Sequence, residues 1–154
     1  MKIKLGPVSR RTAVYEVQAD YLARAIHQLA NACAHQFREG IEFSLENFYR
    51  FRSMPEYENF IEATFVCGFV CTDYGSFFPL EKIHDRPNEV VPTLPFSKMR
   101  HYIHTLQRAE KWSSEYSTAL WTAITSGALL LVARRLESDQ SLYESDKQCD
   151  EEKI

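Results

Sequence analysis

The chain has 154 residues and a formal net charge of −3, with 45% hydrophobic and 25% charged residues. A chain of this length and composition is an ordinary globular protein that can bury a core without metal ions or disulfides. From Ser138 onward six acidic residues stand against two lysines, so this segment carries −4 and the remainder only +1. The remainder therefore offers no excess positive charge for a phosphate backbone, which argues against direct nucleic-acid binding.

Cysteine usage and hydropathy set further limits. Four cysteines in a chain without a secretory pattern at its N-terminus favour reduced thiols and a cytoplasmic protein. The longest uninterrupted apolar run, residues 128–133, is far too short to cross a bilayer. We therefore expect no membrane partner.

The first half of the chain predicts three helices. Residues 16–39 carry an apolar stripe at spacings of three and four, after which Gly40 is placed to end the helix in a left-handed conformation. A shorter helix follows at 44–52. Ser53 then predicts an N-cap, with Glu56 completing a capping box, for a third helix that runs to Cys67 and is closed by Gly68. The stripe of the first helix consists of Leu22, Ile26, Leu29, Cys33 and Phe37.

Helical periodicity is interrupted in the middle of the chain. Residues 69–78 predict a minor β-hairpin, with an aromatic loop as the alternative. Three prolines within 84–95 predict an extended connection. Thr93 is a candidate cap for a fourth helix, 95–109, which turns Met99 and Ile103 inward.

The fifth helix is expected at 115–137 and to be the central one. Its apolar residues recur at spacings of three and four and cover most of its circumference, so it has to be buried against several partners. Gly127 in its middle costs about 1 kcal/mol relative to alanine, and close approach of another helix is the expected compensation. Residues 1–137 then form one compact, mostly α, five-helix bundle-like domain, and residues 138–154 form an acidic tail too polar to bury.

Two sets of residues are candidates for binding a protein partner. Tyr74, Phe77 and Phe78 fall in the aromatic segment, where ring side chains are frequent interface anchors; the alternative is that they cover the bundle. The second set lies on one face of the helix 95–109, and its alternative is a solvated polar face. It consists of Arg100, His101, His104 and Arg108.

Two other classes of function are kept as alternatives. A metal-dependent or acid–base enzyme would combine His101 and His104 with Cys67 and Cys71, but no second cysteine pair or zinc-knuckle sequence follows. Nucleophile-elbow and phosphate-loop patterns are also missing from the sequence, so we expect no catalytic residues, metal or cofactor. A nucleic-acid-binding module would use four arginines and require a steep salt dependence. These are Arg100, Arg108, Arg134 and Arg135.

The C-terminal part resembles an uncharacterised bacterial domain family of unknown function. The matching features are residues 108–112 (RAEKW), Ser126-Gly127, Leu129-Leu130 and residues 134–136 (RRL). Lys111 and Trp112 replace an arginine and a phenylalanine of the family pattern, and the interval to Ser126 is longer. The resemblance covers about a fifth of the chain and implies no activity.

The sequence as a whole favours a non-enzymatic protein that docks on a larger protein. Its size, acidic tail and lack of a catalytic motif are similar in type to small phage-encoded inhibitors of bacterial defence, such as anti-CRISPR proteins. Acidic groups would then occupy the nucleic-acid-binding surface of the partner, and aromatic residues would supply the buried anchors. Self-association is compatible with the same reading.

Overall fold

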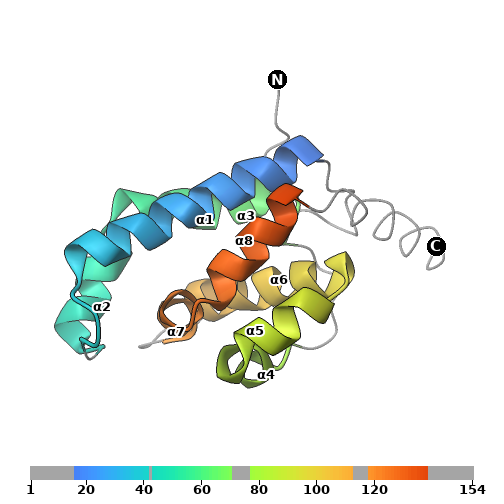
Figure 1. Cartoon of the computed structure of the whole chain (residues 1–154). Coiled ribbons are helices and arrows are strands. Elements are labelled where there is room, and N and C mark those ends of the chain that lie inside the picture. The colour runs from blue at the N-terminus through green and yellow to red at the C-terminus, as the bar shows by residue number, and fades with distance from the viewer. Residues whose placement is uncertain (1–15, 42, 71–76, 113–117, 139–154) are drawn as a thin grey trace.

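The computed structural model describes residues 16–41, 43–70, 77–112 and 118–138, and these are mostly helical. Within them the chain forms eight α-helices and one 3-10 helix (Figure 1). The mostly α fold class is thus confirmed, but the five-helix count is wrong. The helices are α1 (Glu16–Gln36), α2 (Leu45–Arg52), α3 (Pro55–Val66), α4 (Leu80–Asp85), α5 (Pro87–Val90), η1 (Val91–Thr93), α6 (Phe96–Trp112), α7 (Ala119–Thr125) and α8 (Ala128–Ser138).

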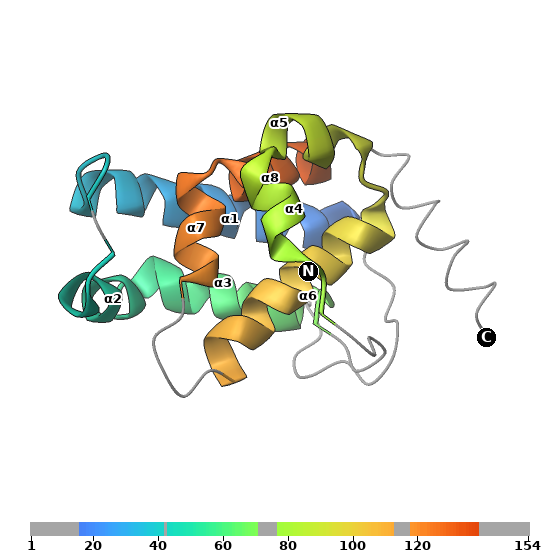
Figure 2. The ribbon, with the colours of Figure 1, turned by 90° about the horizontal axis from the view of Figure 1, so that it is seen from below.

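The longest helix, α1, contributes one side of the core. It packs against α8 and α3, while α6 packs against α7 and α3 (Figure 2). Each member of its predicted apolar stripe is buried, which confirms the periodicity of the sequence. Burying a Leu or Ile side chain of this kind contributes about 1.5–3 kcal/mol, so the stripe fixes the face that α1 turns inward.

Gly68 and Gly127 have positive φ and stand just after the C-terminal ends of α3 and α7. Gly68 has φ +79°, its N–H donates to the Phe65 carbonyl, and the N–H of Phe69 donates to the Thr64 carbonyl. These two bonds form a Schellman motif, which needs a left-handed residue at this position. The expected closure of α3 by Gly68 is therefore confirmed.

The prediction of one continuous central helix at 115–137 is wrong. The described part of this stretch forms α7 and α8, which are bent by 72° with Ser126 and Gly127 at the break. Gly127 has φ +85°, and a Cβ built on it meets nothing within 4 Å. The glycine thus serves the backbone turn, and the close approach of another helix that we expected does not occur.

The connection expected to be extended at 84–95 is also helical. Its first residues belong to α4, and α5 and η1 follow before α6 begins at Phe96. Pro87 and Pro92 each lie in the first turn of their helix, where a missing N–H costs no hydrogen bond. The prolines start helices here instead of preventing them.

The hydroxyls of Ser44, Ser53 and Thr93 all bond to the backbone near helix ends. Ser44 caps α2, because its hydroxyl accepts the Asn47 N–H at 3.2 Å. Ser53 instead ends α2 and donates to the Tyr49 carbonyl, so the predicted capping box with Glu56 is wrong. Thr93 donates to the Val90 carbonyl within η1 and does not cap α6.

Other expectations fall partly outside the described residues. Phe69, Val70, Phe77 and Phe78 are not in a strand, and the rest of the expected hairpin, residues 71–76, is not described. Nearly all of the acidic tail also lies outside. In the described part of the chain, no single helix is long and apolar enough to cross a membrane; only the bent pair α7 and α8, taken together, passes a test of length and composition.

Candidate functional site

Helix α2 stands at one end of the molecule and is held there by an arginine (Figure 1). The Arg50 guanidinium donates to the Gln36 carbonyl at 3.0 Å, where α1 ends with unsatisfied carbonyls. The same group lies over the Phe37 ring, with 4.8 Å between the Arg50 Cζ and the ring centroid. Arg50 therefore joins the short helix α2 to the end of the long one.

A second arginine in the same last turn of α2 binds α6. Arg52 donates to the Glu110 backbone carbonyl at 3.1 Å and lies over the rings of Phe48 and Tyr57. The Tyr57 hydroxyl in turn donates to the Glu110 carboxylate at 2.8 Å. Burial, followed by the charge and hydrogen bond of Glu110, raises the pKa of Tyr57, so the phenol stays protonated. These contacts hold α2 in a defined orientation against α3 and α6.

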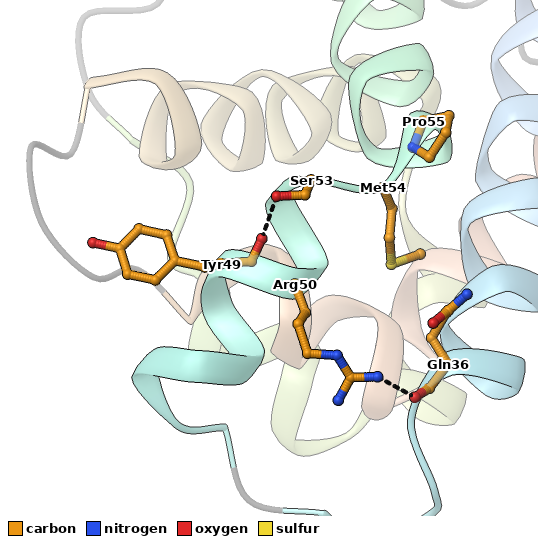
Figure 3. A pocket seen from close by; sticks show the side chains of 6 residues that line it. All are labelled: Gln36, Tyr49, Arg50, Ser53, Met54 and Pro55. Atoms are coloured by element: carbon orange, nitrogen blue, oxygen red, sulfur yellow. Dashed lines mark hydrogen bonds between the residues drawn. The ribbon is translucent and has the colours of Figure 1, made fainter.

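The face of α2 turned away from the core carries large apolar side chains. Leu45 is 58% exposed and Tyr49, one helical turn later, is 61% exposed. Beside them lies an open pocket of about 450 Å³ lined by residues of α1, α2 and the start of α3 (Figure 3). The Tyr49 ring points away from Arg50 and Met54, which lie on the other side of the helix. We refer to the exposed pair Leu45 and Tyr49 as the α2 surface.

The α2 surface was not among the sites expected from the sequence. A signal was present, because LENFYRFR places four large apolar residues in eight positions. Phe48 and Phe51 are buried, and a helix this short cannot turn Leu45 and Tyr49 to the same side as both. One face of a helix cannot bury all four of these residues, so the sequence itself predicts that two of them are exposed.

The aromatic residues expected to bind a partner lie in different environments. Phe77 is 68% exposed, whereas Phe78 is half-buried and packs edge-on against His101 and Tyr102, with ring centroids 5.7 Å and 6.1 Å apart. The Phe78 N–H donates to Thr105 Oγ1 at 2.9 Å. Phe78 therefore covers α6, and Phe77 alone of the described pair is open to a partner. Tyr74 lies outside the described residues.

The polar face of α6 is only partly solvated, which differs from the solvated face stated as the alternative. Arg100 and His104 are buried, and His101 and Arg108 are half-buried. Arg100 Nε donates to the Gly68 carbonyl at 3.0 Å, next to the turn that ends α3. Burial, and then the positive charge of Arg108, His101 and Arg100, lowers the pKa of His104 to about 4. In this structure only His101 and Arg108 of the four reach the surface at all.

A histidine of α4 packs against the same helix. His84 Nε2, from α4, lies 2.8 Å from the Tyr102 hydroxyl, and the two rings meet edge-on. Burial lowers the pKa of His84 and raises that of the fully buried Tyr102. Both groups are therefore neutral near pH 7, and their hydrogen bond ties α4 to α6.

The metal alternative required Cys67 to meet the α6 histidines. Cys67 is fully buried in the hydrophobic core, and burial raises its pKa to about 12, which keeps the thiol protonated. Across the described residues there is no group of three or more His, Cys, Asp or Glu side chains placed to hold a metal ion. Cys71, the other proposed ligand, falls outside the described residues.

The arginines of the nucleic-acid alternative do not form a surface patch. Arg100 is buried on the Gly68 carbonyl, and Arg135 is half-buried and donates to the carbonyls of Val91, at 2.8 Å, and Leu94. Arg134 is exposed on α8 and Arg108 is half-buried on α6. Two of the four guanidiniums are therefore used to fasten the backbone of the fold.

Comparison with models of known protein families, with curated proteins and with solved structures found no match. The resemblance of residues 108–136 to a bacterial domain family stays a prediction.

Proposed function

We propose that the protein is a non-enzymatic docking protein that binds a larger protein through the α2 surface. The carrying observation is the pair Leu45 and Tyr49, both more than half exposed on a helix that two arginines hold in place. Single exposed apolar residues are common on protein surfaces, but tyrosines on a rigid support are typical interface anchors. A fixed helix also loses little conformational freedom on binding, which favours affinity.

The charge of the chain supports a basic partner surface. The negative net charge comes from the segment after Ser138, and within the described helices the outer face of α3 exposes Glu58 and Glu62 one turn apart. Glu46 is exposed in the first turn of α2 itself. A bacterial nucleic-acid-processing or defence complex presents such a basic surface, and occupying it would make this protein an inhibitor. This partner class is proposed on charge complementarity.

The test is a pull-down from bacterial lysate, with and without nuclease, read by mass spectrometry. We expect a nuclease-resistant partner that the double variant Leu45→Ala/Tyr49→Ala no longer retains. The matched control is Tyr21→Ala, which removes a tyrosine 42% exposed on α1 and should leave capture unchanged. Retention of the partner by the folded double variant would exclude the α2 surface.

Two further arms separate the remaining parts of the proposal. Phe77→Ala asks whether the exposed aromatic residue before α4 takes part in the same contact. For the inhibitory role, binding of nucleic acid to the purified partner is measured with and without the protein. An unchanged affinity for nucleic acid would contradict inhibition while leaving the docking interaction intact.

A further inference from the structure

A groove lies between the end of α1 and the bend that joins α7 to α8. Its volume is about 780 Å³, which is within the range of sites that bind small organic molecules. The walls are mostly apolar and come from segments far apart in the sequence. The side chains that form them are Cys33, Phe37, Ile41, Trp121, Ile124 and Leu130.

Two alanines explain why the groove is hollow. Ala30 and Ala34 lie one turn apart on α1 and present only methyl groups to it. On the facing side Trp121 is held by other rings, with Phe37 edge-on at 4.9 Å and Phe43 stacked at 4.7 Å between centroids. Because its aromatic wall is packed in place, the groove exists before any ligand arrives.

The charges around the groove limit what it can hold. Of the described side chains that line it, only those of Arg38 and Glu39 are ionic at neutral pH, and both are exposed at the rim. They are adjacent in sequence and opposite in sign, so together they give no net attraction to an anion or a cation. Burial, together with the charge of Glu56, raises the pKa of the Cys33 thiol to about 12, so the wall carries no thiolate.

We propose that this groove binds one small, uncharged organic molecule with a flat apolar body, which lies between Trp121 and the alanine face of α1. Aromatic walls favour a flat ligand, because stacked and edge-on ring contacts add to the burial of area. An ion placed on these walls would lose its hydration without a buried partner of opposite charge. The site is independent of the α2 surface and does not require the docking function.

The probe for the test is N-phenyl-1-naphthylamine, an uncharged fluorescent molecule, titrated into the full-length Trp112→Phe variant. Trp121 is then the single tryptophan of the chain. We expect saturable binding at one probe per chain, with energy transfer from Trp121 to the probe. The naphthalene sulfonate of the same ring system carries a negative charge and should bind at least about tenfold more weakly, because the groove offers that charge no buried partner.

Filling the groove provides the decisive control. Ala34→Phe places a ring where α1 now presents a methyl group and should weaken probe binding by about tenfold or more. Asn31→Phe adds the same ring at an exposed position of α1 outside the groove and should leave binding unchanged. Circular dichroism shows whether each variant is folded.

Three results would overturn the proposal. They are undiminished probe binding by folded Ala34→Phe, absence of energy transfer from Trp121, and tighter binding of the sulfonate than of the neutral probe. Loss of a protein partner in Ala34→Phe, with no small-molecule binding by the parent protein, would reassign the groove to protein docking. The Leu45→Ala/Tyr49→Ala variant should bind the probe normally, so this test can fail or succeed separately from the docking proposal.

Discussion

Replacing Gly127 with alanine tests the bend between α7 and α8 through the sign of its effect. In a continuous helix, Gly→Ala at a middle position stabilises the fold by about 1 kcal/mol. In the structure Gly127 has φ +85°, a region that costs an L-residue about 1–2 kcal/mol. A Cβ at this position meets no other atom within 4 Å, so no clash adds to this conformational cost. The alanine also reduces the entropy of the unfolded chain, which returns about 0.4–1 kcal/mol.

The expected result for Gly127→Ala is therefore a loss of about 1 kcal/mol in the free energy of unfolding. This is measured by urea denaturation followed by circular dichroism, and it corresponds to a melting temperature lower by about 2–4 °C in a chain of this size. Gly127→Asn should lose less, because asparagine tolerates the left-handed region better than alanine. A higher urea midpoint for Gly127→Ala would refute the bend and restore the single helix.

Three further predictions concern side chains inside the fold. Arg135→Gln should lower the free energy of unfolding, measured in urea, by about 1–3 kcal/mol, because two carbonyls of the segment before α6 lose their hydrogen-bond donor. The control Arg134→Gln changes an exposed arginine and should alter stability by less than about 0.5 kcal/mol. His104 is buried, and its pKa is lowered to about 4, below its unfolded value of about 6.5. The unfolded chain therefore binds a proton first, so the free energy of unfolding is highest above pH 6.5 and falls by roughly 3 kcal/mol as pH falls toward 4. His104→Gln should flatten this pH dependence of stability between pH 7 and 5. Cys33 and Cys67 should react with a disulfide reagent at pH 8 only after denaturation, because burial raises the pKa of both thiols to about 12. The measurement uses a variant in which the other two cysteines are replaced by serine. Fast labelling of the native protein would contradict the burial of these thiols.

Local periodicity was sufficient for the long amphipathic helices. The stripe of α1 and the inward residues Met99 and Ile103 of α6 are all buried, as their spacing predicts. Gly68 ends α3 as expected, because a left-handed residue after a helix is itself a local signal. Information of this kind lies within a few neighbouring residues, so the sequence alone carries it.

Prolines and serines were harder to interpret, since each fits more than one structure. Pro87 and Pro92 stop a helix that precedes them but also suit the first turn of one that follows. Ser53 can accept an N–H at the start of α3 or donate to a carbonyl at the end of α2, and it does the second. Which use prevails depends on the packing of the flanking helices, which the local sequence does not contain.

Burial of the polar face of α6 could not have been predicted from that helix alone. Phe78 and His84 come from residues before α5, and they cover His101 and Tyr102. The spacing of polar residues on α6 is the same whether water or another segment faces them. Long-range packing therefore decides that Arg100 is buried and fastens the turn at Gly68.

The break at Gly127 is also what makes the groove possible. Trp121 and Leu130 are nine residues apart, or about two and a half turns, so a continuous helix would turn them to opposite faces. In the structure both line the same groove, one from α7 and the other from α8. A residue that straightens the bend must therefore separate the two walls. Gly127→Ala keeps the bend at a conformational cost, so the folded variant should still bind one probe per chain, and loss of probe binding by the folded variant would show that the alanine has straightened the bend.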